Sequence, residues 1–307
     1  MQLQQLRYFL AVAETRHFTR AAEAAHVAQP SLSQQIRALE RELGAELFHR
    51  TRGNIALTDA GDALLPLARR ILADTESARL AVQETVQLRR GRVRLGAPPS
   101  LCTSLVPDVL RVFRDRYPGV TLVVREGGSR DLVGWLAAGE LDLALVITPP
   151  SGEQAPALAV TALLHEELVL VAAERQARRK VRVTELKGRP LVMFREGYDL
   201  REATLAACRA AGFEPEFAVE GGEMDAVLGF VRAGIGPAVV PGMVAARSGL
   251  AVTAFAGPGL GRTIAVAHGH EVPLTRAAEA LHTTLLAHLR DAARSGELPP
   301  GTTLLLP

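Results

Sequence analysis

Residues 18–61 read FTRAAEAAHVAQPSLSQQIRALERELGAELFHRTRGNIALTDAG, and this stretch decides the fold of the N-terminal part of the chain. It predicts a short alanine-rich helix, a tight turn and a second helix that is opened by Pro30. A basic, hairpin-like segment with Arg50 and Arg52 follows, and a new helix begins near Thr58. This order is the layout of a winged helix-turn-helix, which places one helix in the major groove of DNA.

The second of these helices has two chemically different faces. At roughly 100° per residue, one face is an apolar stripe that is expected to pack on a core, made of Leu32, Ile36, Leu39 and Leu43. The opposite face carries glutamine and arginine, which pair with adenine and with guanine or phosphate. A solvated face is the alternative, but the preceding helix, the turn and the basic wing favour DNA. The residues expected to contact DNA are Gln29, Pro30, Ser31, Ser33, Gln34, Arg37, Arg41, Arg50 and Arg52.

The motif order resembles a known family. The run AAEAAHVAQPSLSQQIRALERELGAELFHR at 21–50, followed by LTDAG at 57–61, is similar to the N-terminal signature of LysR-type transcriptional regulators. Coarser features extend the resemblance over nearly the whole chain. Two residues depart from it: His17 stands where many members have serine, and Ala25 stands where a bulkier leucine is common. We expect His17 to alter a helix cap. We expect Ala25 to leave a smaller side chain in the core between two helices.

The resemblance implies a function and partners. It implies a sequence-specific DNA-binding transcriptional regulator, controlled by a small-molecule effector that binds between two α/β subdomains. The implied partners are double-stranded promoter DNA, RNA polymerase and a second copy of the chain, with two dimers joined into a tetramer. One alternative is the same DNA-binding regulator without a small-molecule effector. Another is a regulator that responds to redox conditions through a single cysteine.

Length and composition agree with a multidomain globular protein. The 307 residues suggest two or three domains, and 48% are hydrophobic while 22% are charged. The charge is uneven: fourteen arginines and ten carboxylates precede Leu95, so the first third is net +4 and the remainder is slightly acidic. The two cysteines have no disulfide or metal-ligand spacing. No apolar run reaches the ~18 residues that span a membrane, so we expect a cytoplasmic location, no membrane contact, no metal and no cofactor.

The remaining sequence divides into a helical linker and an α/β domain. Residues 59–90 show a long apolar band at helix spacing, which is expected to bury its stripe against a second copy. From residue 91 strands and helices alternate, which predicts a buried, mostly parallel sheet. We therefore expect a winged helix-turn-helix at 1–58, a dimerisation helix at 59–90 and a regulatory domain at 91–307. The resemblance implies the fold of periplasmic solute-binding proteins for that domain, with one subdomain at about 91–162 and 268–307 and the other at about 163–267.

Loops that follow the predicted strands supply candidate effector contacts. Ligands in such sheets bind at the carboxyl ends of strands, beside helix N-termini. Hydroxyls, backbone N–H groups and an arginine in these loops would suit a small anion, such as a carboxylate. The resemblance also implies effector contacts at Ser100 and Ser129, for which simple helix capping is the alternative. The candidate residues are Ser100, Thr103, Ser129, Arg195, Gly197, Tyr198 and Glu223.

Catalysis and thiol sensing find little support in the sequence. No Walker loop, GxSxG or GxGxxG follows a strand, so no catalytic residue and no enzyme activity are predicted. In similar peroxide-sensing regulators a reactive cysteine stands at the start of the helix that here runs from residue 199. This chain has Asp199 there and keeps only Cys208 later in the helix. Because a thiolate is the attacking group in such chemistry, the two-cysteine mechanism lacks its nucleophile.

Overall fold

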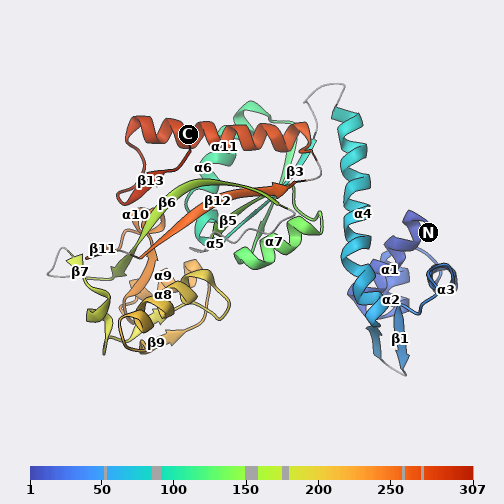
Figure 1. Cartoon of the computed structure of the whole chain (residues 1–307), viewed down its shortest axis with the longest axis horizontal. Helices are drawn as coiled ribbons and strands as arrows, with labels where there is room; N and C mark the ends of the chain where they lie inside the picture. Colours follow the sequence, from blue (N-terminus) through green and yellow to red (C-terminus); the bar gives the residue numbers. More distant parts are fainter. Residues whose placement is uncertain are drawn as a thin grey trace. The chain divides into compact units, whose positions relative to one another are not determined.

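The computed structural model describes residues 1–51, 54–84, 91–148, 158–174, 180–257, 260–270 and 273–306. They form two compact units, one made mainly of Met1–Val86 and the other of most residues from Gln87 to Pro307. The first unit is helical with a two-stranded hairpin, and the second is α/β (Figure 1). The expected fold class, a winged helix-turn-helix with a long helix and an α/β regulatory domain, is confirmed. No helix in these ranges is long and apolar enough to cross a membrane.

The first unit is the winged helix-turn-helix. Its core buries Leu32, Ile36 and Leu39 of the second helix of the motif completely. The fourth residue of the predicted stripe, Leu43, is 43% exposed, so that part of the prediction is wrong. Leu43 is the last residue of its helix and precedes the left-handed C-cap Gly44, which carries it past the core. The elements are α1 (Leu3–Thr15), α2 (Phe18–Ala24), α3 (Gln29–Leu43), β1 (Phe48–Thr51), β2 (Asn54–Leu57) and α4 (Asp59–Glu84).

The LTDAG run fixes the start of α4 against the wing. The Thr58 N–H donates to the Leu47 carbonyl at 3.1 Å, and its Oγ1 accepts from the Gly61 N–H at 3.1 Å. A Cβ at position 61 would lie 2.2 Å from the Leu47 carbonyl oxygen. Only glycine permits this close approach of helix and chain.

The side chain of His17 caps the start of α2. Its Nδ1 accepts from the backbone N–H groups of Thr19 at 3.2 Å and Arg20 at 3.5 Å, at the start of α2. A side-chain acceptor at this position satisfies N–H groups that a helix start leaves unpaired. The departure at residue 17 therefore preserves the cap with different chemistry.

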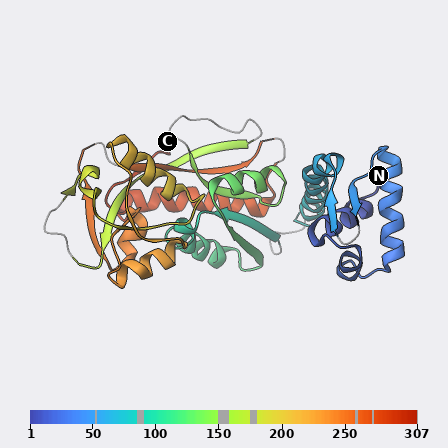
Figure 2. The same ribbon diagram turned by 90° about the horizontal axis from the view of Figure 1, so that it is seen from below.

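The second unit contains two lobes, and the first lobe is a sheet between helices. Its strand order is β4-β3-β5-β12-β6. Alternate residues face opposite sides: Leu143 and Leu145 pack with α6 and α11, while Ala144 and Val146 pack with α7. Figures 1 and 2 show α11 lying along this sheet. The elements are β3 (Gly91–Ala97), α5 (Pro99–Cys102), α6 (Val106–Arg116), β4 (Val120–Glu126), α7 (Ser129–Ala137), β5 (Leu143–Thr148), β6 (Leu158–Ala172), β12 (Gly261–Gly269), α11 (Arg276–Ser295) and β13 (Thr302–Leu304).

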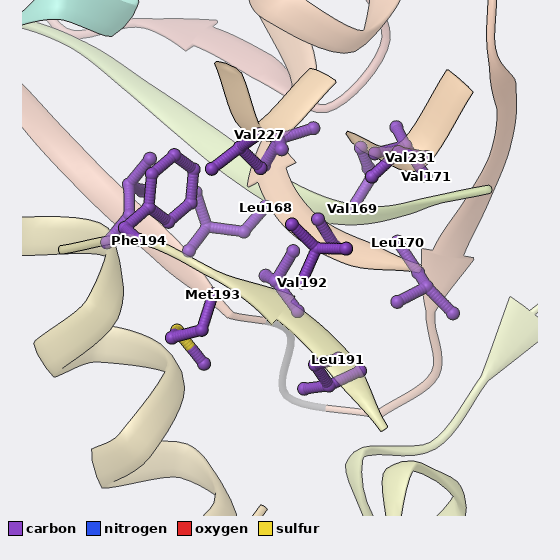
Figure 3. Packing of buried hydrophobic residues seen from close by; sticks show 14 of the residues in the cluster. Leu168, Val169, Leu170, Val171, Leu191, Val192, Met193, Phe194, Val227 and Val231 are labelled. Atoms are coloured by element: carbon purple, nitrogen blue, oxygen red, sulfur yellow. The ribbon is translucent and has the colours of Figure 1, made fainter. Parts of the chain in front are cut away.

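The second lobe has its own core. Side chains of β6, β8 and α9 meet in it, including Leu170, Val192 and Val227 (Figure 3). Its elements are β7 (Lys180–Val181), a 3₁₀ turn (Val183–Leu186), β8 (Leu191–Met193), α8 (Asp199–Ala210), β9 (Phe217–Glu220), α9 (Met224–Arg232), β10 (Ala238–Pro241), α10 (Gly242–Ser248) and β11 (Ala251–Phe255).

One strand, β6, belongs to both lobes. Its first part pairs with β12, and residues 168–172 pair with β10 and β11, in each case antiparallel. The sheets are therefore mixed rather than mostly parallel, because the long strands that pass between the lobes run against their neighbours. His268 pairs with Ala159 inside the first lobe, so we place the second passage between the lobes before Gly261, not near His268. The other domain and subdomain bounds remain predictions.

Candidate DNA-reading face and effector site

The predicted DNA-reading face of α3 is open to solvent. Gln34, Arg37 and Arg41 are exposed along it, Ser33 beside them is half-buried, and the helix start presents Gln29, Pro30 and Ser31, also exposed. The N-cap residue Ala28 offers no side-chain cap. Because the first N–H groups of a helix lack internal partners, the start of α3 has donors available for a phosphate.

The carboxylates of α3 are engaged within the unit. Glu40 is buried, and its Oε1 accepts the Leu47 N–H at 3.1 Å, which ties α3 to the chain that enters the wing. Glu42 pairs with the N-terminal amino group of Met1. Arg41 donates from Nε to the Arg37 carbonyl at 3.3 Å. In these contacts neither arginine of the reading face is paired with a carboxylate.

The wing is described in part. Strands β1 and β2 pair antiparallel from Phe48 opposite Leu57 to Thr51 opposite Asn54, as a hairpin requires. Arg50 lies in β1, but its side chain is outside the described atoms. Arg52 lies outside the described residues. The DNA contacts assigned to both arginines stay predictions.

In the second unit, the predicted contact Ser100 lies in a buried ionic cluster. Glu166 of β6 and Arg262 of β12 face each other directly across the two strands. Arg262 donates from Nε and Nη2 to Glu166 Oε1 at 2.8 and 2.7 Å, and from Nη1 to Ser100 Oγ at 3.0 Å. Glu166 and Ser100 are fully buried and Arg262 is 6% exposed. Ser100 is therefore held by a charge from the strand pair and makes no helix-capping bond.

Ser129 connects both lobes through Asp199. Its Oγ donates to Asp199 Oδ2 at 2.7 Å and accepts from the Ile147 N–H at 2.9 Å. Its backbone N–H also donates to the same carboxylate oxygen, at 3.3 Å. Ser129 starts α7 in the first lobe and Asp199 starts α8 in the second. The carboxylate thus takes the position that an anion would occupy at the start of α7.

Tyr198 and Glu223 bring unpaired polar atoms to the same region. Tyr198 is 3% exposed, and its ring stacks on Phe194 with centroids 4.8 Å apart. Its hydroxyl lies close enough to Ser100 for a weak interaction, and the charges of Arg262 and Glu223 act on it, but it has no partner at normal hydrogen-bond geometry among the described residues. Glu223 Oε1 accepts from Arg195 Nε at 2.5 Å, whereas the buried Oε2 has no partner among the described residues. Burial raises the pKa of Tyr198 above its ordinary value, so the phenol stays protonated.

The structure therefore brings most of the predicted effector contacts together, with two exceptions. Thr103 donates to the Ser100 carbonyl at 3.2 Å and serves the local turn. Gly197 supplies a left-handed turn (φ 75°) before Tyr198. Sequence reasoning missed Glu166, Asp199 and Arg262 as members of the site. A signal existed: Glu166 and Arg262 are charges within apolar strand sequence, and such charges are buried only when paired.

No cluster of three or more histidine, cysteine or acidic side chains suited to a metal ion occurs in the described part of the chain. The site's chemistry is that of hydrogen bonding and paired charge.

Comparison with known proteins matches both units to one family. Residues 3–62 match the family model described as bacterial regulatory helix-turn-helix protein, lysR family. Residues 87–290 match the model of the LysR substrate binding domain. The transcriptional dual regulator GltC of Bacillus subtilis (strain 168) is 35% identical over 243 residues, which cover 78% of this chain and 81% of that protein. A probable hydrogen peroxide-inducible genes activator of Streptomyces viridosporus is 34% identical over 304 residues, 95% of this chain and 94% of its own.

Solved structures show the same likeness. A full-length OxyR from Pseudomonas aeruginosa with a cysteine-to-aspartate substitution is 28% identical, with a TM-score of 0.72 over 93% of this chain and 94% of that one. Full-length CbnR, a structure solved with its target DNA, is 25% identical, with a TM-score of 0.69 over 95% of this chain and 100% of that one.

Because some relatives are named for hydrogen peroxide, the state of the two thiols matters. Cys208 is fully buried, and burial raises its pKa to about 11. Cys102 is half-buried, and burial together with Glu126 raises its pKa to about 12. Both thiols are therefore protonated at neutral pH and are poor nucleophiles.

We expect both cysteines to resist alkylation in the native chain. At pH 8 the thiolate fraction of each is more than roughly 100-fold below that of an ordinary cysteine, so iodoacetamide should label the denatured chain far faster than the native one. Mass spectrometry of timed samples measures this, and the native rate should climb only as pH approaches 11. A native cysteine labelled at the denatured rate at pH 8 would reopen the redox alternative.

Proposed function

The chain belongs to the LysR family of transcriptional regulators, with that family's DNA-binding and effector-binding domains, and from this premise we propose how its residues act. It is a regulator and not an enzyme. In our proposal α3 lies in the major groove of double-stranded promoter DNA, and the wing follows the phosphate backbone. The observation that carries this is the two-faced α3: one side is buried by Leu32, Ile36 and Leu39, and the other exposes Gln34, Arg37 and Arg41.

The effector, in this proposal, binds in the second unit beside Ser100, Tyr198 and Glu223. Support comes from the convergence of two lobes there and from two buried polar atoms without partners. Buried groups of this kind are rare in native proteins unless a water, ion or ligand satisfies them. Ligand binding at this position would alter how the lobes meet, and thereby the arrangement of the DNA-binding domains and their contact with RNA polymerase.

We further propose that α4 joins two copies of the chain and that two dimers form a tetramer. Leu67 of α4 is 57% exposed, and Ile71 and Leu72 are only partly buried. An exposed apolar band on a 26-residue helix is the usual mark of a helix that pairs with another.

The DNA-binding proposal predicts the following loss of affinity. On a site selected by the wild-type chain from random DNA, Gln34→Ala and Arg37→Ala should each cost ~1–3 kcal/mol and relax base preference. Arg52→Ala should weaken binding to all DNA sequences, and it should lower the slope of log affinity against log salt concentration by roughly one unit. Gel shifts at several salt concentrations measure both effects, with Arg294→Ala, at an exposed position of α11, as the matched control. Wild-type affinity in all three variants would show that these residues of α3 and the wing do not contact DNA.

The assembly proposal predicts that Leu67→Arg yields a smaller species. A charge placed in an apolar helix pairing would lose its solvation, so sedimentation velocity should show monomers. Glu76→Arg is the matched control, because Glu76 is exposed on the same helix about 180° away. Equal sedimentation of wild type and Leu67→Arg would mean that α4 does not hold the assembly at this position.

A further inference from the structure

The anion position that the sequence predicts at the start of α7 is already filled. Asp199 Oδ2 accepts both the Ser129 hydroxyl, at 2.7 Å, and the Ser129 N–H, at 3.3 Å. A helix N-terminus favours negative charge, and here the chain provides that charge from its own second lobe. A carboxylate ligand would have to displace the Asp199 carboxylate, which is part of the chain and therefore always present at this position.

The cations of the site are also matched with carboxylates. Arg262 is paired with Glu166, and Arg195 with Glu223. Asp131 adds a further negative charge that acts on Arg195. With Asp199 included, four carboxylates face two guanidinium groups in this region. A second anion would therefore meet net repulsion, which is least screened beside the buried Glu166 and is weakened by solvent beside Arg195 and Glu223, whose side chains are 42% and 44% exposed.

The buried polar atoms without partners at this site can accept hydrogen bonds from a ligand. Glu223 Oε2 is buried, although the Glu223 side chain as a whole is 44% exposed, and it has no hydrogen bond among the described residues. A carboxylate oxygen only accepts. The Tyr198 hydroxyl, on a side chain that is 97% removed from solvent, also lacks a partner at normal hydrogen-bond geometry among the described residues, although it lies close to Ser100 and is acted on by the charges of Arg262 and Glu223. A buried polar group without a partner is destabilising, so a ligand that reaches both atoms would be held strongly.

We propose that the effector of this chain is a small protonated amine, whose ammonium group donates to Glu223 Oε2 and to the Tyr198 hydroxyl oxygen. This inference rests on the effector position given above and replaces the carboxylate that the sequence suggests. Asp199 acts as a specificity-determining residue, because it fills the anion position and so excludes acidic ligands.

Matched probes on one carbon skeleton test the ligand class. We expect n-butylamine to raise the melting temperature of the effector-domain transition of the full chain, and butyrate and n-butanol to leave it unchanged. Tyr198→Phe and Glu223→Gln remove one hydroxyl and one charge with little change of shape. Each should weaken butylamine binding by roughly tenfold in calorimetric titration. Glu216→Gln, at an exposed glutamate of the same lobe, is the matched control and should bind as the wild type does.

A rescue experiment tests the tethered carboxylate separately. Asp199→Ala empties the anion position, so acetate should raise the melting temperature of this variant and not that of the wild type. Adding Ser129→Ala should abolish the acetate effect, because the hydroxyl donor is lost. If Asp199→Ala does not fold, Asp199→Asn serves instead, and a higher affinity of butyrate for it than for the wild type is expected.

The outcomes separate the ligand class from the effector position. If butyrate binds the wild type and Tyr198→Phe weakens that binding, the effector position is correct and the proposal of an amine ligand is wrong. If butylamine binds but neither Tyr198→Phe nor Glu223→Gln changes its affinity, the proposed effector position is wrong as well. No shift with butylamine, or no acetate rescue, contradicts the amine proposal.

Discussion

The second unit depends on the buried pair of Glu166 and Arg262. The two residues stand opposite each other on β6 and β12, at the point where β6 leaves one sheet for the other. Removing two charges from water costs several kcal/mol per ion and is offset only by good geometry and further hydrogen bonds. Both are present: two guanidinium N–H groups reach one carboxylate oxygen, and the Met243 N–H donates to the other at 3.2 Å. The pair thereby connects the two strands, α10 and, through Ser100, the short helix α5.

In the first unit, buried polar groups have the same structural role. Glu40 turns inward to hold the Leu47 N–H, and Thr58 links the wing to α4. These bonds leave glutamine and arginine as the exposed chemistry of the predicted reading face of α3, while Glu42 stays exposed beside it. A carboxylate on that face would repel phosphate, so its inward placement serves both the fold and DNA binding.

Sequence reasoning located the parts whose signals are local. The period of Leu32, Ile36 and Leu39 predicted a buried stripe, and the LTDAG run predicted a helix start that the structure explains by Thr58 and Gly61. Ser100 and Ser129 were placed at loop positions that converge. The charged partners of these serines, Asp199 and Arg262, come from residues 70 or more positions away. Strand pairing decides such contacts, so no local pattern could predict that Asp199 fills the anion position or that β6 serves two sheets.

The central claim is that the second unit depends on the direct interaction of Glu166 with Arg262, and a double-mutant cycle measures the coupling of these two side chains. Trp135 is the single tryptophan of the chain and lies in α7, so its fluorescence follows urea unfolding of this unit alone. Glu166→Gln and Arg262→Met should each lose ~3–5 kcal/mol, because each leaves a buried charge unpaired. The double variant should lose clearly less than the sum of the two. Losses that simply add would show that the pair is not coupled and would contradict this account.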